Sequence, residues 1–205
     1  MFGVLKVLRV RKVFEVLGVL RRLALGLLLA AALTPTACAR PRTDAAAAQR
    51  IRPAYDAAGH LKRLEYDSDG DGKIDTWGYM DGARVIRVEV DENGDGQVDR
   101  WEYHSESGKT VERIERSTRR DGVVSRREYF DGGSLARIEE DTNGDGKIDK
   151  WETYTGGTLT MMALDTMARG TPDRRLVYDA DGTLDRIEVD PTGSGHFQPL
   201  STAGK

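Results

Sequence analysis

The chain has 205 residues, with 31 Lys plus Arg, 34 Asp plus Glu, a formal net charge of −3 and one cysteine. One cysteine excludes a disulfide scaffold within the chain. Residues 1–37 hold six basic residues and one acid, which leaves 25 basic and 33 acidic residues, a net charge of −8, in residues 38–205. This acidic remainder excludes a nucleic-acid binder that neutralises phosphates with bulk positive charge.

Residues 1–37 have the organisation of a signal peptide. Basic side chains at Lys6, Arg9, Arg11, Lys12, Arg21 and Arg22 precede an apolar run at residues 23–33. A run of 11 residues is too short to span a bilayer, which takes about 20 residues, but suits a signal-peptide core. We therefore expect a signal helix that is removed on export.

The end of this leader resembles a bacterial lipoprotein signal, in which cleavage precedes a cysteine that is then diacylated. Thr36 and Ala37 before Cys38 fit that pattern, whereas Pro35 departs from the usual Leu. The residue after the cysteine is Ala39 rather than an aspartate, which resembles lipoproteins that are sorted to the outer membrane. The resemblance implies a lipid anchor at Cys38 that holds an exported protein at the outer membrane or cell surface. The alternative is an ordinary secretory signal with an incidental cysteine.

Residues 38–54 show no strand pattern and are predicted to be the lipidated cysteine and a flexible tether. Residues 55–198 then contain a unit that recurs about every 24 residues. Its most regular part is an acidic nine-residue segment at 67–75, 91–99 and 141–149. Divergent copies stand at 117–125, 165–173 and, truncated, 190–196. The sequence thus predicts six units, followed by a disordered tail at 199–205.

The segments on either side of each acidic loop alternate with period two, which indicates strands. In residues 61–66, Leu64 and Tyr66 share one face, and Arg63 and Glu65 share the other. Gly-containing turns separate the units. We predict an all-β antiparallel meander with tight turns along one edge and acidic loops along the other. One face should carry an Ile, Val, Trp and Tyr stripe, and the other a ladder of Arg and Glu.

The acidic loops carry the clearest chemical signal. Residues 91–102 and 141–152 fit Asp-x-Asn-x-Asp-Gly-x-x-Asp-x-x-Glu, which resembles the calcium loop of EF-hand proteins. Calcium takes six to eight oxygen ligands, and alternate residues of a tight loop can direct theirs inward. The resemblance covers the loop alone, because the 12 residues between Gly78 and Asp91 leave no room for two helices.

This resemblance implies calcium ligands at loop positions 1, 3, 5, 7, 9 and 12, with a backbone carbonyl at position 7. The predicted ligands are Asp67, Asp69, Asp71, Lys73, Asp75, Asp91, Asn93, Asp95, Gln97, Asp99, Glu102, Asp141, Asn143, Asp145, Lys147, Asp149 and Glu152. The first loop has Gly78 at position 12 and should bind more weakly. The ligand roles of Glu102 and Glu152 depend on whether the strand that leaves the loop brings them back to the metal. The alternative is that Asp, Asn and Gly form stable turns without metal.

The three divergent loops are predicted to be metal-free. Counted in chain order, the third loop (residues 117–125) holds Arg119 and Arg120. The fifth (residues 165–173) holds Met167 and Arg169, and the sixth (residues 190–196) holds Thr192 and Ser194. In the third loop a guanidinium can replace the charge of an ion. The Tyr-Asp-x-x-Gly-x-Leu phrase that begins a unit also resembles the YD repeats of RHS-type surface proteins.

Periodic metal loops without a nucleophile–base pair indicate a calcium-binding protein with a structural or interaction role at the cell envelope, and no enzyme. Its partner could be an envelope protein or a polysaccharide. A first alternative is a carbohydrate- or polymer-binding module that uses Trp77, Trp101 and Trp151, although a repeated Trp position is more often core. A second is an envelope hydrolase with a pair of these carboxylates, but catalysis needs one singular site.

Overall fold

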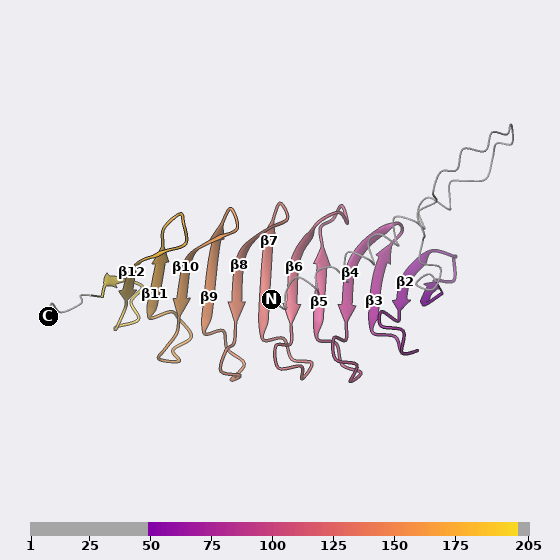
Figure 1. Cartoon of the computed structure of the whole chain (residues 1–205), viewed down its shortest axis with the longest axis horizontal. Helices are drawn as coiled ribbons and strands as arrows, with labels where there is room; N and C mark the ends of the chain where they lie inside the picture. The colour runs from indigo at the N-terminus through magenta and orange to yellow at the C-terminus, as the bar shows by residue number, and fades with distance from the viewer. Residues whose placement is uncertain (1–48, 201–205) are drawn as a thin grey trace, which may run out of the picture.

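The computed structural model describes residues 49–200, which form a single sheet of 13 strands in sequence order (Figure 1). The strands are β1 Ile51–Tyr55, β2 Leu61–Tyr66, β3 Thr76–Asp81, β4 Arg84–Val90, β5 Arg100–His104, β6 Val111–Arg116, β7 Arg126–Asp131, β8 Ser134–Glu140, β9 Lys150–Thr155, β10 Thr158–Leu164, β11 Arg174–Tyr178, β12 Leu184–Val189 and β13 Gln198–Pro199. Within residues 49–200 no helix is long and apolar enough to cross a membrane. The predicted signal helix and Cys38 lie outside the described residues.

Every strand pairs antiparallel with the strands next to it in sequence, so the predicted all-β antiparallel meander is confirmed. Short turns at residues 82–83, 132–133 and 156–157 connect strands along one edge. The longer acidic loops follow the even-numbered strands and lie along the opposite edge, at the bottom of the view in Figure 1. The two rows of connections therefore separate the loops of interest from the tight turns.

The sheet begins earlier than the sequence predicts. Residues 51–54 belong to the predicted tether, but Ile51–Tyr55 forms strand β1 and pairs with β2. Pro53 hides the strand pattern, because proline cannot donate to a ladder. An edge strand tolerates it, and Pro53 lies opposite Leu64 in β2. The tether assignment for residues 51–54 is therefore wrong.

The predicted division of the two faces is also wrong. Directly opposed residues of antiparallel strands point to the same face, and Trp77 lies opposite both Glu65 and Glu89. Tyr79 likewise lies opposite Arg87. The aromatic residues therefore share a face with the Arg and Glu ladder. The nine residues of the acidic loop between Tyr66 and its partner Thr76 decide this register.

The shared face carries three copies of a Tyr–Arg–Glu cluster. In the second copy the Arg113 guanidinium lies 4.2 Å from the centre of the Tyr103 ring, and the Tyr103 hydroxyl donates to Glu115 at 3.1 Å. Arg113 also pairs with Glu115 at 3.3 Å. The equivalent clusters are Tyr79, Arg87 and Glu89, and Tyr129, Arg137 and Glu139. Cation–π contacts and ion pairs here replace a continuous apolar stripe.

The opposite face is apolar at one end and charged in the middle. Leu64, Met80, Val85 and Val88 form a buried cluster across β2, β3 and β4. From β5 to β9 a chain of ion pairs continues from strand to strand. Its members are Glu102, Arg100, Glu92, Arg116, Glu128, Arg126, Glu140, Lys150 and Glu152. Alternating charges on neighbouring strands stabilise this face around the aliphatic side chains of Ile114 and Ile138.

Candidate metal centre

Six acidic or related loops lie side by side along one edge of the described sheet (Figure 1). They follow β2, β4, β6, β8, β10 and β12 and are called the first to sixth loops below, beginning at residues 67, 91, 117, 141, 165 and 190. Neighbouring loops are two strands apart, which corresponds to about 10 Å. This edge gathers most of the predicted ligands.

Position 1 of each acidic loop is a buried carboxylate that accepts hydrogen bonds from backbone N–H groups of the same loop. Asp141 accepts the backbone N–H of Gly144 at 2.6 Å with one oxygen and that of Gly146 at 2.9 Å with the other. The same two bonds recur at Asp67, Asp91 and Asp190. Both glycines have positive φ, 85° and 86° in the fourth loop, a conformation that favours glycine because it has no Cβ. The position-1 carboxylate therefore orders the turn between positions 4 and 6 of the loop.

Position 9 closes the loop from its other end. Asp75, Asp99 and Asp149 each accept the backbone N–H of position 2 at 3.0 Å. In the first and fourth loops the position-2 residue also donates its hydroxyl, from Ser68 at 2.7 Å and from Thr142 at 2.8 Å. These hydroxyls help to satisfy the position-9 carboxylates of those two loops.

The second loop lacks such a hydroxyl, because position 2 is Glu92. Asp99 is 2 % exposed, and its Oδ1 is buried without a hydrogen-bond partner. Burial raises the pKa of the Asp99 carboxyl, and the negative charges of Asp95 and Asp91 raise it further. A buried acceptor that no donor satisfies is costly. Of the position-9 carboxylates in the first, second and fourth loops, Asp99 is therefore the one that keeps a buried oxygen without a donor.

Positions 3 and 5 supply the exposed oxygens. In the first loop the carboxylate oxygens of Asp67, Asp69 and Asp71 lie within 4.8 Å of one another, close enough to hold one ion. In the second loop Asn93 accepts the N–H of Asp95 at 2.9 Å, and Asp95 accepts that of Gln97 at 2.8 Å. Asn143 and Asp145 do the same in the fourth loop. The three loops therefore present equivalent oxygens.

The other predicted ligands lie at the margins of these loops. Lys73, Gln97 and Lys147 donate their backbone N–H to position 5, and their side chains are exposed. Glu102 and Glu152 stand in β5 and β9, three residues beyond position 9, about 10 Å along the strand. Glu102 pairs with Arg100 at 2.5 Å, and Glu152 with Lys150 at 3.2 Å. The structure does not bring these two glutamates together with the loop carboxylates.

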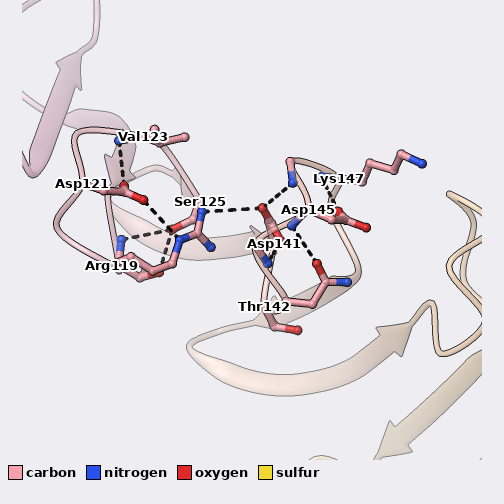
Figure 2. A network of polar contacts seen from close by, with 12 residues as sticks. Arg119, Asp121, Val123, Ser125, Asp141, Thr142, Asp145 and Lys147 are labelled. Carbon is pink, nitrogen blue, oxygen red and sulfur yellow. Dashed lines mark hydrogen bonds and ion pairs between the residues drawn. The ribbon is translucent and has the colours of Figure 1, made fainter.

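The third loop keeps the shape of its neighbours without their acids. Ser125 replaces the position-9 aspartate and accepts the N–H of Thr118 at 3.0 Å (Figure 2). Ser117 replaces the position-1 aspartate and bonds to Asp121 at 2.9 Å. Arg120, at position 4, has a φ of 58° where the first, second, fourth and sixth loops use glycine. The turn therefore forms without carboxylates at either end.

Arginine side chains extend from one loop to the next, which sequence reasoning missed. Arg119 of the third loop places Nη2 3.9 Å from a carboxylate oxygen of Asp141 in the fourth (Figure 2). Its Nη1 lies 2.9 Å from where a Cβ on Gly144 would be. Arg169 of the fifth loop similarly donates to the carbonyl oxygen of Pro191 at 3.1 Å. The sequence shows these arginines but not the loop that each one reaches.

A comparison with known protein families matches one of these loops. The EF-hand family model matches residues 141–153, within the fourth loop and the start of β9. No curated protein sequence matches the chain. A solved structure of the accessory secretory proteins 1, 2 and 3 of Streptococcus pneumoniae is similar at 15 % identity, with a TM-score of 0.30 over 58 % of this chain and 19 % of that one. The chain spans less than a fifth of that relative's length.

Proposed function

We propose that this protein binds calcium through its acidic loops and has a structural or interaction role at the cell envelope. The observation that carries the calcium proposal is the buried, unpartnered Oδ1 of Asp99 in a loop that also presents Asp91, Asn93 and Asp95. Calcium prefers carboxylate and amide oxygens, which are the donors of this loop. The EF-hand match to the fourth loop and the carboxylate cluster of the first support the same chemistry.

The geometry favours a structural use of the ion. The position-1 carboxylates of the first, second and fourth loops already accept hydrogen bonds from the turn. Calcium would therefore stabilise a loop that is already formed. Repetition of the site along one edge suits a cation that neutralises neighbouring negative loops. Calcium at the millimolar concentrations found outside cells saturates even weak sites of extracellular modules. In this proposal calcium stiffens the loop edge of a sheet built of six two-strand units.

Export and anchoring complete the proposal and rest on the sequence. The leader at residues 1–37 and Cys38 resemble a lipoprotein signal. A lipid-anchored protein at the outer membrane or cell surface would meet the calcium that its loops require. Radiolabelled fatty acid should label the wild-type protein in its bacterial host and leave Cys38→Ala unlabelled. Absence of label on the wild type would contradict the anchor without affecting the calcium proposal.

Calorimetric titration and thermal unfolding of the full-length chain, after removal of metal with EDTA, test calcium binding. Ligand that binds the native state stabilises it by RT ln(1 + [L]/Kd), about 2.7 kcal/mol for a site at 100 times its Kd. We expect calcium to raise the Tm of the wild type. Asp99→Asn should lose one calcium site, and it should be at least as stable as wild type in EDTA, because a neutral amide replaces an unpaired buried charge.

Asp173→Asn is the matched control, because it changes the same position of a loop predicted to be metal-free. Both Asp173 oxygens have donors, the Thr166 hydroxyl at 2.7 Å and the Met167 N–H at 2.8 Å. This variant should keep the wild-type calcium stoichiometry. No calcium binding by the wild type, or full binding by Asp99→Asn, would contradict the proposal.

A carbohydrate- or polymer-binding function is the second candidate, and the position of the tryptophans favours it. Trp77, Trp101 and Trp151 are half-buried on the face that carries the Arg and Glu ladder, rather than in the apolar cluster. Trp77 and Trp101 stand two strands apart, about 10 Å. Iodide should quench their fluorescence, and a bound glycan should protect it. Fluorescence that no polysaccharide changes would contradict this function.

A further inference from the structure

We propose that the positive charge of the Arg119 guanidinium lowers the calcium affinity of the fourth loop. The second loop then binds calcium more tightly, although both loops have Asp, Asn, Asp and Asp at positions 1, 3, 5 and 9. The inference rests on the proposed calcium function and specifies how two equivalent ligand sets differ. The difference comes from the loop that precedes each of them.

The placement of Arg119 is the first step. Its guanidinium lies between two carboxylates, 3.3 Å from Asp121 in its own loop and 3.9 Å from Asp141 in the fourth. Figure 2 shows it reaching from one loop toward the other. Asp141 occupies position 1 of the fourth loop, where the calcium pattern places a ligand. The positive charge is therefore close to the position that calcium would take.

The second loop shows the contrasting arrangement. A Cβ added to Gly94, its position-4 glycine, would meet nothing within 4 Å, whereas one on Gly144 would meet the Arg119 guanidinium. The loop that precedes the second has Asp69 at position 3, where the third loop has Arg119. The second loop is thus open on this side, and its Asp99 has an unpartnered oxygen.

The same contact at two other loops indicates that the arrangement is built into the edge. Arg50 lies 3.0 Å from where a Cβ on Gly70 would be, and Arg169 lies 3.2 Å from the corresponding point on Gly193. Both arginines also donate to a backbone carbonyl of that loop, Ser68 at 3.3 Å and Pro191 at 3.1 Å. A guanidinium against the position-4 glycine therefore recurs.

Electrostatics gives the sign and the size of the effect. A cation beside a position-1 ligand repels calcium or must be displaced by it, so its removal should tighten binding. Arg119 is 39 % exposed, so water and salt weaken the repulsion. We expect Arg119→Gln to lower the Kd of the fourth loop about three- to tenfold, and high salt should reduce the difference.

The test isolates the fourth loop within the full-length chain. Asp71→Arg and Asp95→Arg replace the position-5 ligands of the first and second loops. Arginine is the residue at this position of the fifth loop, where it is Arg169. Calorimetric titration of this double variant with calcium then reports the fourth loop. Arg119→Gln in this background should tighten binding. In EDTA, Arg119→Gln should lower the Tm of the double variant, because the contact with Asp141 is lost. With saturating calcium, Arg119→Gln should raise the Tm of the double variant.

Arg120→Gln is the matched control, because it removes the same charge one residue away. Among residues 49–200 no ion pair joins Arg120 to the fourth loop, and the effect of Arg120→Gln on the Kd should stay below about twofold. Arg119→Lys keeps the charge and should tighten binding less than Arg119→Gln. Unchanged or weaker binding by Arg119→Gln, or equal effects of the two glutamine variants, would overturn the inference and leave calcium binding intact. Loss of calcium binding in the double variant would overturn it too, and absence of binding by the wild type would defeat the proposed function itself.

Discussion

The third and fourth loops lie side by side, follow the same course and carry different charge. Residues 117–125 hold two arginines and one aspartate, whereas residues 141–149 hold three aspartates and one lysine. Ser125 and Asp149 nevertheless accept the same backbone N–H, from position 2, at 3.0 Å. The shape of the turn therefore depends on an acceptor oxygen at each end and on positive φ in between. The negative charge is a separate property, available for a cation.

The greatest loss of stability is expected from a substitution at position 1 of the fourth loop. Asp141→Ala leaves the N–H groups of Gly144 and Gly146 without their acceptor, and should cost about 2–4 kcal/mol of unfolding free energy. Asp145→Ala, at the exposed position 5, should cost under about 1 kcal/mol. Urea unfolding in EDTA measures both without any contribution from calcium. Equal costs would show that the buried carboxylate does not cap the turn.

A smaller effect is expected at position 4. Gly144→Ala forces a Cβ onto a residue with φ of 85° and against Arg119, and should cost about 1–2 kcal/mol. Gly94→Ala meets the same φ penalty in open space and should cost less. Arg120→Gly, in the third loop, should stabilise by up to about 1 kcal/mol, because glycine adopts a φ of 58° without strain. The same unfolding assay orders the three, and a destabilised Arg120→Gly would contradict the argument.

The response to acid should also distinguish loops with a carboxylate at position 1 from the third loop, which has a serine there. Burial opposes ionisation of Asp190, yet the backbone N–H of Gly195 and the hydroxyl and N–H of Thr192 lower its pKa from the ordinary 3.8 to about 2. A folded-state pKa below the unfolded one stabilises the protein above pH 3.8, and this stabilisation is lost as the pH falls toward 2. Asp190→Ser, which copies Ser117 of the third loop, should therefore be less stable at pH 7 and lose less on acidification. Unfolding in EDTA at pH 7, 4 and 2 checks this, with Ser117→Ala expected to keep the wild-type acid slope.

Much of the fold could be predicted from local patterns. Period-two alternation and Gly-rich turns identify most strands, and their short spacing leaves an antiparallel meander as the simple solution. The arrangement of the faces could not be predicted in this way. Alternation shows which residues of one strand share a face, but the path of the acidic loop decides whether Trp77 lies opposite Glu65. The strand at residues 51–54 could not be predicted from the pattern, because Pro53 interrupts the alternation.

The candidate site was predictable in its ligand types but not in its differences. Spacing alone places equivalent oxygens in the first, second and fourth loops. That Asp99 lacks a donor depends on Glu92 replacing a Ser or Thr at position 2, a substitution that looks neutral in sequence. That Arg119 reaches Asp141 depends on contact across two strands, which no local pattern contains.

The strand order has a mechanical consequence. Each hydrogen-bonded pair joins consecutive strands, so the sheet is a linear array in which stability is roughly a sum over neighbouring hairpins. Such an array has low contact order and can unzip from either end while its interior stays intact. It can also lengthen or shorten by whole hairpins, because within residues 49–200 no distant segment has to repack. A globular core, which closes on itself, has no such freedom.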